Sequence, residues 1–220
     1  MLPEEWPAIT PVNFFQLAFD CDPLEGAREF PSLDVSQKRY LFPSTAMLCE
    51  EERFADFFMG WSPEGIEVLA HVQVPFKVVS YPAISRGDSL ELFFDTRDLK
   101  SSGYNSRFCH HFFFLPEAVE GVVAQEITRF RLEETHELCD PKELKVKTRF
   151  AEKGYELHVF IPSHCLYGYD PVQMNRIGFT YRMNRAVGPP QHLSVMSQDY
   201  PIEQQPSLWS SVTFRTKGKQ

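Results

Sequence analysis

The side chains best suited to chemistry are concentrated in one stretch, residues 87–116, with the sequence GDSLELFFDTRDLKSSGYNSRFCHHFFFLP. Residues 90–95 and 107–115 are rich in aromatic and aliphatic side chains, and a polar segment separates them. This pattern is typical of two strands joined by a turn, so the stretch predicts a β-hairpin. The hairpin would hold acidic, basic, thiol and imidazole groups close together: Glu91, Asp95, Arg97, Asp98, Arg107, Cys109, His110 and His111.

Strand alternation predicts which of these groups share a face. Successive side chains point to opposite sides of a strand, so inward residues at 90, 92 and 94 would leave Glu91 and Asp95 facing the other way. His110 falls on the core side, where a buried, hydrogen-bonded ring is expected. Applied to the neighbouring strands, the same alternation adds further polar residues to this face: Glu67, His71, Arg107, His111, Glu156, His158, Thr180 and Arg182.

A face that gathers acids, arginines and histidines is suited to a polar ligand. Guanidinium groups form planar, paired hydrogen bonds, which fits a sugar or a carboxylate. An exposed tyrosine in the SSGYNS loop could stack on a sugar ring. We therefore predict a ligand-binding site made of Glu91, Asp95, Arg97, Tyr104, Arg107, His111 and Arg182.

Two plainer interpretations of the same residues stay open. The polar face could be the solvated outside of a β-sandwich, which is where such side chains usually lie. Alternatively, Asp95 or Asp98 could brace Arg97 and Arg107 across the turn and so fix its shape.

Metal binding and catalysis have weaker support in the sequence. His110 and His111 point to opposite faces and so cannot easily share an ion, whereas Cys109 and His111 could do so with His71 or His158. No CxxC or HxxxH spacing supports such a site, so we predict no metal ligands. There is also no GxSxG, HExxH or P-loop motif, and we predict that the protein is not an enzyme.

Composition and charge limit the classes of molecule that the protein is expected to bind. The formal net charge of -8 argues against nucleic acid and against anionic membranes as partners. No apolar run approaches the roughly 20 residues that span a bilayer, and the N-terminus has none of the features of a signal peptide. The five cysteines are irregularly spaced, so reduced thiols in a cytoplasmic protein are expected. Nothing in the sequence sets the oligomeric state.

Short apolar segments separated by turns run through the whole chain and predict an all-β fold. We expect about ten strands, one or two short helical turns such as residues 162–166, a segment at 39–42 that pairs at a sheet edge, and no long helix. The architecture is an antiparallel β-sandwich, jelly-roll-like, forming a single domain over residues 1–220 with an N-terminal arm at 1–12. The expected strands are 13–20, 53–61, 66–74, 90–95, 107–115, 122–132, 145–150, 155–161, 177–184, 193–196 and 209–215.

Four runs, together with the closing LWSSVTF, resemble the family-9 carbohydrate-binding modules and the wider DOMON-like β-sandwiches. They are GIEVLAHVQV, GDSLELFFDTRD, YELHVFIPSHCLYG and IGFTYRMNR. The positions that carry the resemblance are Gly87, Asp88, Glu91, Asp95, Glu156, Ile161, Pro162, Gly178 and Phe179. The resemblance implies a noncatalytic sandwich that binds sugars, with structural calcium in some members.

The chain also departs from that family. The xylanase-linked members hold their sugar between two tryptophans, and Trp61 and Trp209 do not match those positions; Trp61 is instead expected in the core. The leading hypothesis is a noncatalytic module for a carbohydrate or a related polar small molecule. One alternative is a protein-interaction or assembly domain that uses the same face, and another is a DOMON-like domain that binds haem or a metal.

Overall fold

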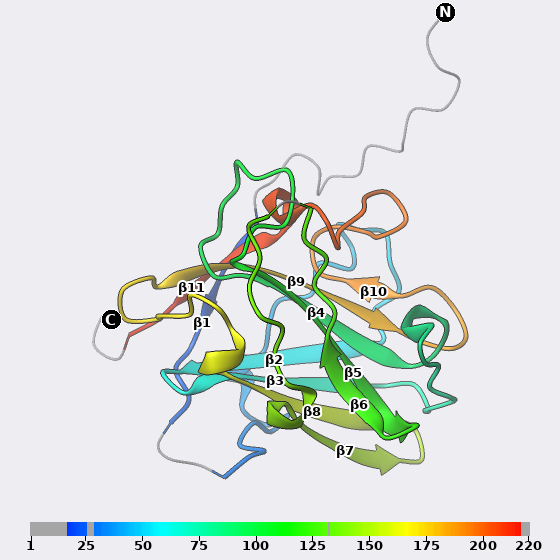
Figure 1. Ribbon diagram of the computed structural model, residues 1–220. Coiled ribbons are helices and arrows are strands. Elements are labelled where there is room, and N and C mark those ends of the chain that lie inside the picture. The colour runs from blue at the N-terminus through cyan, green and yellow to red at the C-terminus, as the bar shows by residue number, and fades with distance from the viewer. Residues whose placement is uncertain (1–16, 26–28, 132, 217–220) are drawn as a thin grey trace, which may run out of the picture.

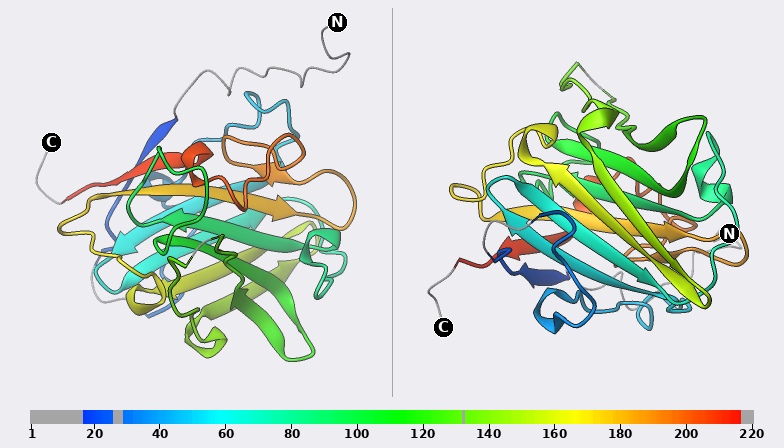
Figure 2. Two further views of the ribbon diagram at one scale, coloured as in Figure 1. Left: turned by 45° about the horizontal axis from the view of Figure 1, so that its top comes forward. Right: turned by 90° about the horizontal axis from the view of Figure 1, so that it is seen from below.

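The computed structural model describes residues 17–25, 29–131 and 133–216, and these form two β-sheets that pack face to face. Figure 1 shows β9, β4 and β10 of the larger sheet above the strands of the smaller one, and the view from below in Figure 2 faces the smaller sheet. Neighbouring strands are antiparallel except β1 and β11, which pair in parallel. The β-sandwich predicted from the sequence is confirmed.

The larger sheet has seven strands. In spatial order they are β1 (Ala18–Cys21), β11 (Ser210–Phe214), β9 (Arg176–Asn184), β4 (Ser89–Asp95), β5 (Cys109–Val119) and β6 (Val122–Glu126), with β10 (Gln191–His192) paired to β9. The smaller sheet is β2 (Ala55–Ser62), β3 (Gly65–Val72), β8 (Gly154–Pro162) and β7 (Lys145–Ala151). The described helical segments are short 3-10 turns: η2 (Lys38–Tyr40), η3 (Ile84–Arg86), η4 (Pro141–Glu143), η5 (Ser163–Cys165) and η6 (Pro206–Leu208).

Most expected strands are present, and two local predictions need correction. Residues 193–196 do not form a strand, because Ser194 has a φ of 68°, a left-handed conformation that interrupts an extended chain. The predicted strand 122–132 ends at Glu126. The segment at 39–42 begins inside the turn η2, and Leu41 bridges to Phe58 on the edge strand β2, as an edge-pairing segment should. The predicted arm at 1–12 and residues 13–16 lie outside the described residues.

The core between the sheets is largely aromatic. Phe57 of the smaller sheet stacks on Tyr181 of the larger one, with ring centroids 3.6 Å apart. Trp61 is 7% exposed and lies beside Phe214, so it belongs to the core as expected. Burial of this many large apolar side chains is the main force that holds the two sheets together.

Loops cover much of the outer face of the larger sheet, and they explain why its strands are apolar on both sides. One apolar cover packs Phe93 against Trp209, Ile202 and Val195. A second packs Phe113 and Leu115 against Ile84, with Tyr81 alongside. The uncovered area between these two covers is polar.

The prediction that all the outward polar residues share one face is wrong. Glu67, His71, Glu156 and His158 lie on the smaller sheet, whereas Glu91 lies on the larger one. The strand period tells which residues are opposite the core, but each sheet of a sandwich has its own outer face. Glu67, for example, is buried there against the backbone of Ser32 and Leu33.

The prediction that all five cysteines are reduced is also wrong. Cys139 and Cys165 form a disulfide between two segments 26 residues apart, with their Cα atoms separated by 4.9 Å. Cys21, Cys49 and Cys109 are free and buried. None of the helical segments in the described part of the chain has the length and hydropathy of a membrane-spanning helix.

Candidate functional site

A cavity of about 570 Å³ opens on the outer face of the larger sheet, between the two apolar covers. Glu91 of β4, His111 of β5 and Arg182 of β9 form its floor. The strand register brings them together, because Arg182 is directly opposite Glu91 and His111 is opposite Phe93, one diagonal position away. All three were predicted as site residues from the sequence.

Glu91 is the centre of a saturated hydrogen-bond network. Arg182 binds it with two parallel bonds of 2.8 Å, from Nε to Oε1 and from Nη2 to Oε2. Nδ2 of Asn184 donates to Oε1 at 2.7 Å, and Nε2 of His111 lies 2.8 Å from Oε2. Burial raises the pKa of Glu91, but the bonds from His111 and Arg182 outweigh it and lower the pKa to about 2. The hydrogen bonds that the Glu91 carboxylate accepts thus come from the protein's own groups, and they hold Arg182 and His111 in place.

Several polar groups around this floor remain able to meet a ligand. Nη1 of Arg182 lies 2.7 Å from Oε1 of Glu203, whose side chain is 30% exposed. Among the described residues, Nδ1 of His111 has no hydrogen-bond partner, and the ring stacks on Phe93 at 4.2 Å. Arg129 is exposed at the rim. Glu203 and Arg129 come from loops, and Arg129 lies in the part of the predicted strand 122–132 that follows the end of β6.

Aromatic side chains form part of the wall. Tyr81 and Phe113 both line the cavity, and their ring centroids are 6.0 Å apart. Tyr81 belongs to the loop before β4, which Asp88 fixes by accepting hydrogen bonds from the backbone N–H groups of Lys77 and Val78. The cavity thus combines a charged floor with an apolar side, as small-molecule sites usually do.

Asp95 and Arg97 lie elsewhere. Asp95 is 1% exposed and accepts hydrogen bonds from the backbone N–H groups of Arg97 and Leu99, at 2.9 and 2.6 Å. The guanidinium group of Arg97 donates to the carbonyl oxygen of Gly168 and lies 4.6 Å from the ring of Phe108. Both residues stabilise the turn and its neighbouring loop, and neither lines the cavity.

Asp98 does not brace Arg97 or Arg107 as the alternative interpretation suggested. It pairs with Lys100 at 2.7 Å and with Arg176 at 2.8 Å. Arg107 is exposed, with its guanidinium group 5.5 Å from the ring of Phe108. Its side chain does not line the cavity.

Tyr104 is exposed, as predicted, and lines a second cavity of about 250 Å³. Arg129 and Gln204 line both cavities, so Tyr104 lies close to the larger one. The structure therefore brings Glu91, His111 and Arg182 together with Tyr104 nearby, and it separates Asp95, Arg97 and Arg107 from them.

The metal set considered from the sequence is not assembled. His71 and His158 belong to the smaller sheet, on the other side of the sandwich from His111. Sγ of Cys109 instead lies 3.8 Å from Oγ of Ser106.

A serine–histidine–glutamate array lies beside β10. Nδ1 of His192 is 2.5 Å from Oε1 of Glu51, and Nε2 is 2.8 Å from Oγ of Ser197. This order of groups resembles a nucleophile, its base and an orienting carboxylate. However, the backbone N–H of Ser197 also donates to Nε2 at 3.2 Å, and the backbone N–H of His192 donates to Glu51. The array therefore closes one tight loop and ties it to the segment that carries Glu51.

No protein-family profile and no curated protein matches the chain. Solved structures do match. A family 9 carbohydrate-binding module from Caldicellulosiruptor kristjanssonii in complex with cellotriose superposes with a TM-score of 0.63 at 14% identity, covering 92% of this chain and 95% of that one. A family 9 module from the same organism in complex with glucose superposes with a TM-score of 0.65 at 14% identity, covering 92% of this chain and 98% of that one. The chain has a CBM9-like fold.

A third similar structure is a putative carbohydrate-binding protein from Bacteroides uniformis ATCC 8492, with a TM-score of 0.56, 11% identity and coverage of 90% and 99%. At these identities the likeness concerns the fold. Within the CBM9-like fold, the run GDSLELFFDTRD (residues 87–98) has clear structural roles in this chain. A Cβ atom at Gly87 would lie 2.6 Å from the backbone nitrogen of Ser80, and Asp88 holds the same loop. Glu91 then enters the cavity floor, while Asp95 closes the turn.

Proposed function

We propose that the protein is a noncatalytic binding module whose cavity above Glu91, His111 and Arg182 takes a carbohydrate or a related polar small molecule. The main support for this proposal is the preorganised floor of the cavity, in which the buried carboxylate of Glu91 holds a guanidinium group and an imidazole ring in fixed positions. Preorganised polar groups reduce the entropy lost on binding. The fold agrees with this function, since two similar structures are complexes with cellotriose and glucose.

The dimensions and chemistry of the cavity suit one or two sugar rings. Ligand pockets commonly enclose about 300–1,000 Å³, and this cavity has about 570 Å³. Glu203 can accept hydrogen bonds from sugar hydroxyls, and Arg129 can donate them. Tyr81 offers a ring face or edge to the apolar side of a pyranose, and the buried ring of Phe113 lies beside it.

Titration calorimetry with glucose, cellobiose and cellotriose, followed by a glycan array, tests this proposal. Arg129→Ala removes an exposed cavity group without disturbing the floor, and we expect it to weaken binding about tenfold, the loss of one charge-assisted hydrogen bond. Arg149→Ala is the matched control, because Arg149 is an exposed arginine on the smaller sheet. If no sugar on the array binds at millimolar concentration, or if both variants bind equally well, the proposal is wrong.

The two alternatives from the sequence remain separate hypotheses. Light scattering that finds a stable dimer, lost in Arg129→Ala, would favour an assembly domain. Absorption spectroscopy of the purified protein would detect a bound haem. The cytoplasmic location stays a prediction, and a disulfide is more common in oxidising compartments; cell fractionation would test it.

A further inference from the structure

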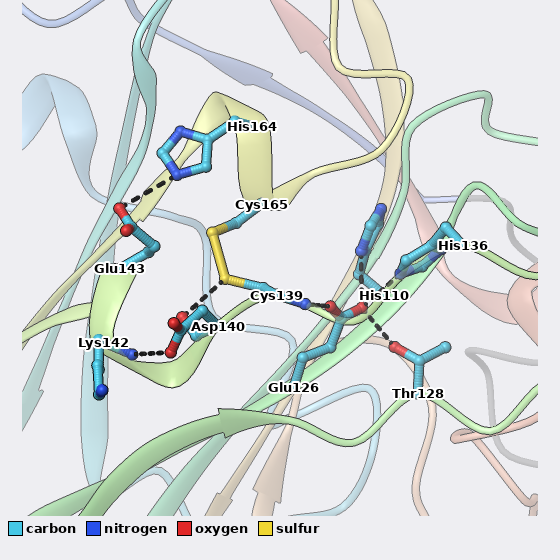
Figure 3. Close-up of a disulfide and its surroundings, with 10 residues drawn as sticks. All are labelled: His110, Glu126, Thr128, His136, Cys139, Asp140, Lys142, Glu143, His164 and Cys165. Atoms are coloured by element: carbon cyan, nitrogen blue, oxygen red, sulfur yellow. Dashed lines mark hydrogen bonds and ion pairs between the residues drawn. A yellow bond between two sulfur atoms is a disulfide. The ribbon is translucent and has the colours of Figure 1, made fainter.

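A second buried carboxylate, Glu126 at the end of β6, lies outside the cavity and collects hydrogen bonds from four groups. Nδ1 of His110 and Nε2 of His136 both lie 2.8 Å from its Oε1, and the hydroxyl of Thr128 donates to the same atom at 2.7 Å. The backbone N–H of Cys139 donates to Oε2 at 2.8 Å. Figure 3 shows Glu126 between the two imidazole rings and Thr128 on one side and the disulfide segment on the other.

The contacts of His136 leave a place for one cation, a proton or a metal ion, at its Nε2. Nδ1 is 2.7 Å from the carbonyl oxygen of Arg107, which can only accept, so Nδ1 carries a hydrogen. Nε2 faces the carboxylate of Glu126, which in its ionised form also only accepts. Either a second proton or a metal ion must therefore lie between Nε2 and Oε1. The side chain of His136 is 2% exposed, so this charge would be buried.

His110 has a ring nitrogen that is buried without a hydrogen-bond partner. When Nδ1 donates to Glu126, the neutral ring leaves Nε2 as a bare acceptor, and this atom is buried without a hydrogen bond. An unpaired buried acceptor is destabilising. A metal ion bound at Nδ1 would place the ring hydrogen on Nε2, and the backbone of Tyr167 lies near this ring. One ion would thus bind the facing nitrogens of both histidines.

We propose that Nδ1 of His110, Oε1 of Glu126 and Nε2 of His136 form a site for a divalent transition-metal ion, with zinc the first candidate. These atoms all lie within 4.8 Å of one another. Among the described residues, no other group of three or more His, Cys, Asp or Glu side chains comes this close together. Two imidazoles and one carboxylate are an established zinc-binding set, with water free to take a fourth position. The soft nitrogen ligands disfavour calcium and magnesium, which take oxygen ligands.

The groups around these ligands are those that usually orient a metal site. Metal-binding histidines typically donate their other N–H to a backbone carbonyl or a carboxylate, as His136 does to Arg107. Thr128 and Cys139 hold the two carboxylate oxygens of Glu126. Zinc bonds of about 2.0–2.1 Å separate tetrahedral ligands by roughly 3.3 Å, so each 2.8 Å contact must open by about half an ångström. The neighbours of His136 at 133–135 and 137–138 are exposed and allow this adjustment.

The proposed metal site is distinct from the cavity. His110 points to the core side of β5, whereas His111 points into the cavity floor. The ion would fasten the segment that carries His136 to the ends of β5 and β6. The disulfide between Cys139 and Cys165 fixes the same segment three residues further along.

Zinc titration of the full chain, stripped with a chelator and with its disulfide intact, tests the proposal. We expect one ion per chain with a Kd below about 1 µM, measured by competition with a chromophoric chelator, and a rise in melting temperature. Cobalt should give visible absorption bands typical of tetrahedral coordination. His136→Gln should weaken binding at least 100-fold, whereas His164→Gln should leave it unchanged. His164 is the matched control because it is an exposed histidine 3.3 Å from the carboxylate of Glu143.

The zinc titration of the wild-type protein tests the proposed site even if His136→Gln does not fold. Less than 0.2 zinc per chain at 10 µM free zinc would overturn the proposal, as would equal losses in the two histidine variants. Nitrogen NMR of the ring gives an independent check. Zinc should move the Nε2 resonance of His136 into the range of a metal-bound nitrogen, and an unchanged spectrum at saturating zinc would also overturn the site.

Discussion

His110 and His111 are adjacent in the chain, yet each is 2.8 Å from a different buried glutamate, Glu126 and Glu91 respectively. Strand alternation sends the two rings to opposite sides of β5. His110 lies beside Phe112 on the core side, and His111 stacks on Phe93 on the outer side. Thr128 links the two networks, because its hydroxyl accepts the backbone N–H of His111 and donates to Glu126.

The hydrogen bonds of Glu91 should make the free energy of unfolding depend on pH in the acidic range. The pKa of Glu91 falls from 4.5 to about 2 on folding, so its contribution is complete above pH 4.5 and is lost as the pH falls from 4.5 to about 2. The loss should approach roughly 3 kcal/mol. Urea unfolding between pH 2 and pH 6 measures it. Glu91→Gln should be less stable at neutral pH and should show a shallower acid dependence; an identical slope in both proteins would contradict this assignment.

Arg182→Lys should destabilise the protein and weaken ligand binding. Lysine cannot reproduce the two parallel bonds to Glu91, and it leaves a buried carboxylate partly unpaired. We expect a loss of about 2–3 kcal/mol in the free energy of unfolding. Arg149→Lys, in a surface pair with Glu156 at 3.5 Å, should change it by less than about 1 kcal/mol. Equal effects at the two positions would show that the floor is not specially organised.

Reduction of the disulfide should lower stability by about 3–4 kcal/mol, because a 26-residue separation leaves a sizeable loop unconstrained in the unfolded chain. Urea unfolding with and without dithiothreitol measures the difference. The double variant Cys139→Ala, Cys165→Ala is the control and should be insensitive to dithiothreitol. If it keeps the sensitivity, another pair of thiols is responsible.

Gly87→Ala should be strongly destabilising. The added Cβ would lie 2.6 Å from the backbone nitrogen of Ser80 and 2.8 Å from the carbonyl oxygen of Val78, and backbone atoms cannot easily move aside. We expect a loss above about 2 kcal/mol. At Gly103 the same Cβ meets open space, so Gly103→Ala is the matched control and should change little. Thermal unfolding of the two variants would reveal whether close packing of the loop before β4 is required.

Ser197 should not react with a fluorophosphonate probe. Nε2 of His192 is shared between the hydroxyl and the backbone N–H of Ser197, which suits a loop closure better than proton removal. Ser197→Ala should lower stability by about 1 kcal/mol. Mass spectrometry after labelling, with a known serine hydrolase in the same sample, gives the answer. A phosphonate adduct on Ser197 would contradict the noncatalytic function.

The sequence by itself determined the sandwich architecture and much of the cavity floor. Period-two alternation is a property of the strand, so it correctly placed Glu91, His111 and Arg182 opposite the core and His110 within it. It could not say on which sheet an outward residue lies, so it grouped Glu67 with Glu91. That choice depends on strand pairing, which joins residues far apart in the chain.

Tertiary structure alone decided the rest, because loops follow no period. Packing of loops on the larger sheet brings Tyr81, Arg129 and Glu203 to the cavity from three separate segments. It also joins Cys139 to Cys165 and sets His136 against Glu126. These contacts arise where buried polar groups find partners in three dimensions, and spacing along the chain carries little information about them.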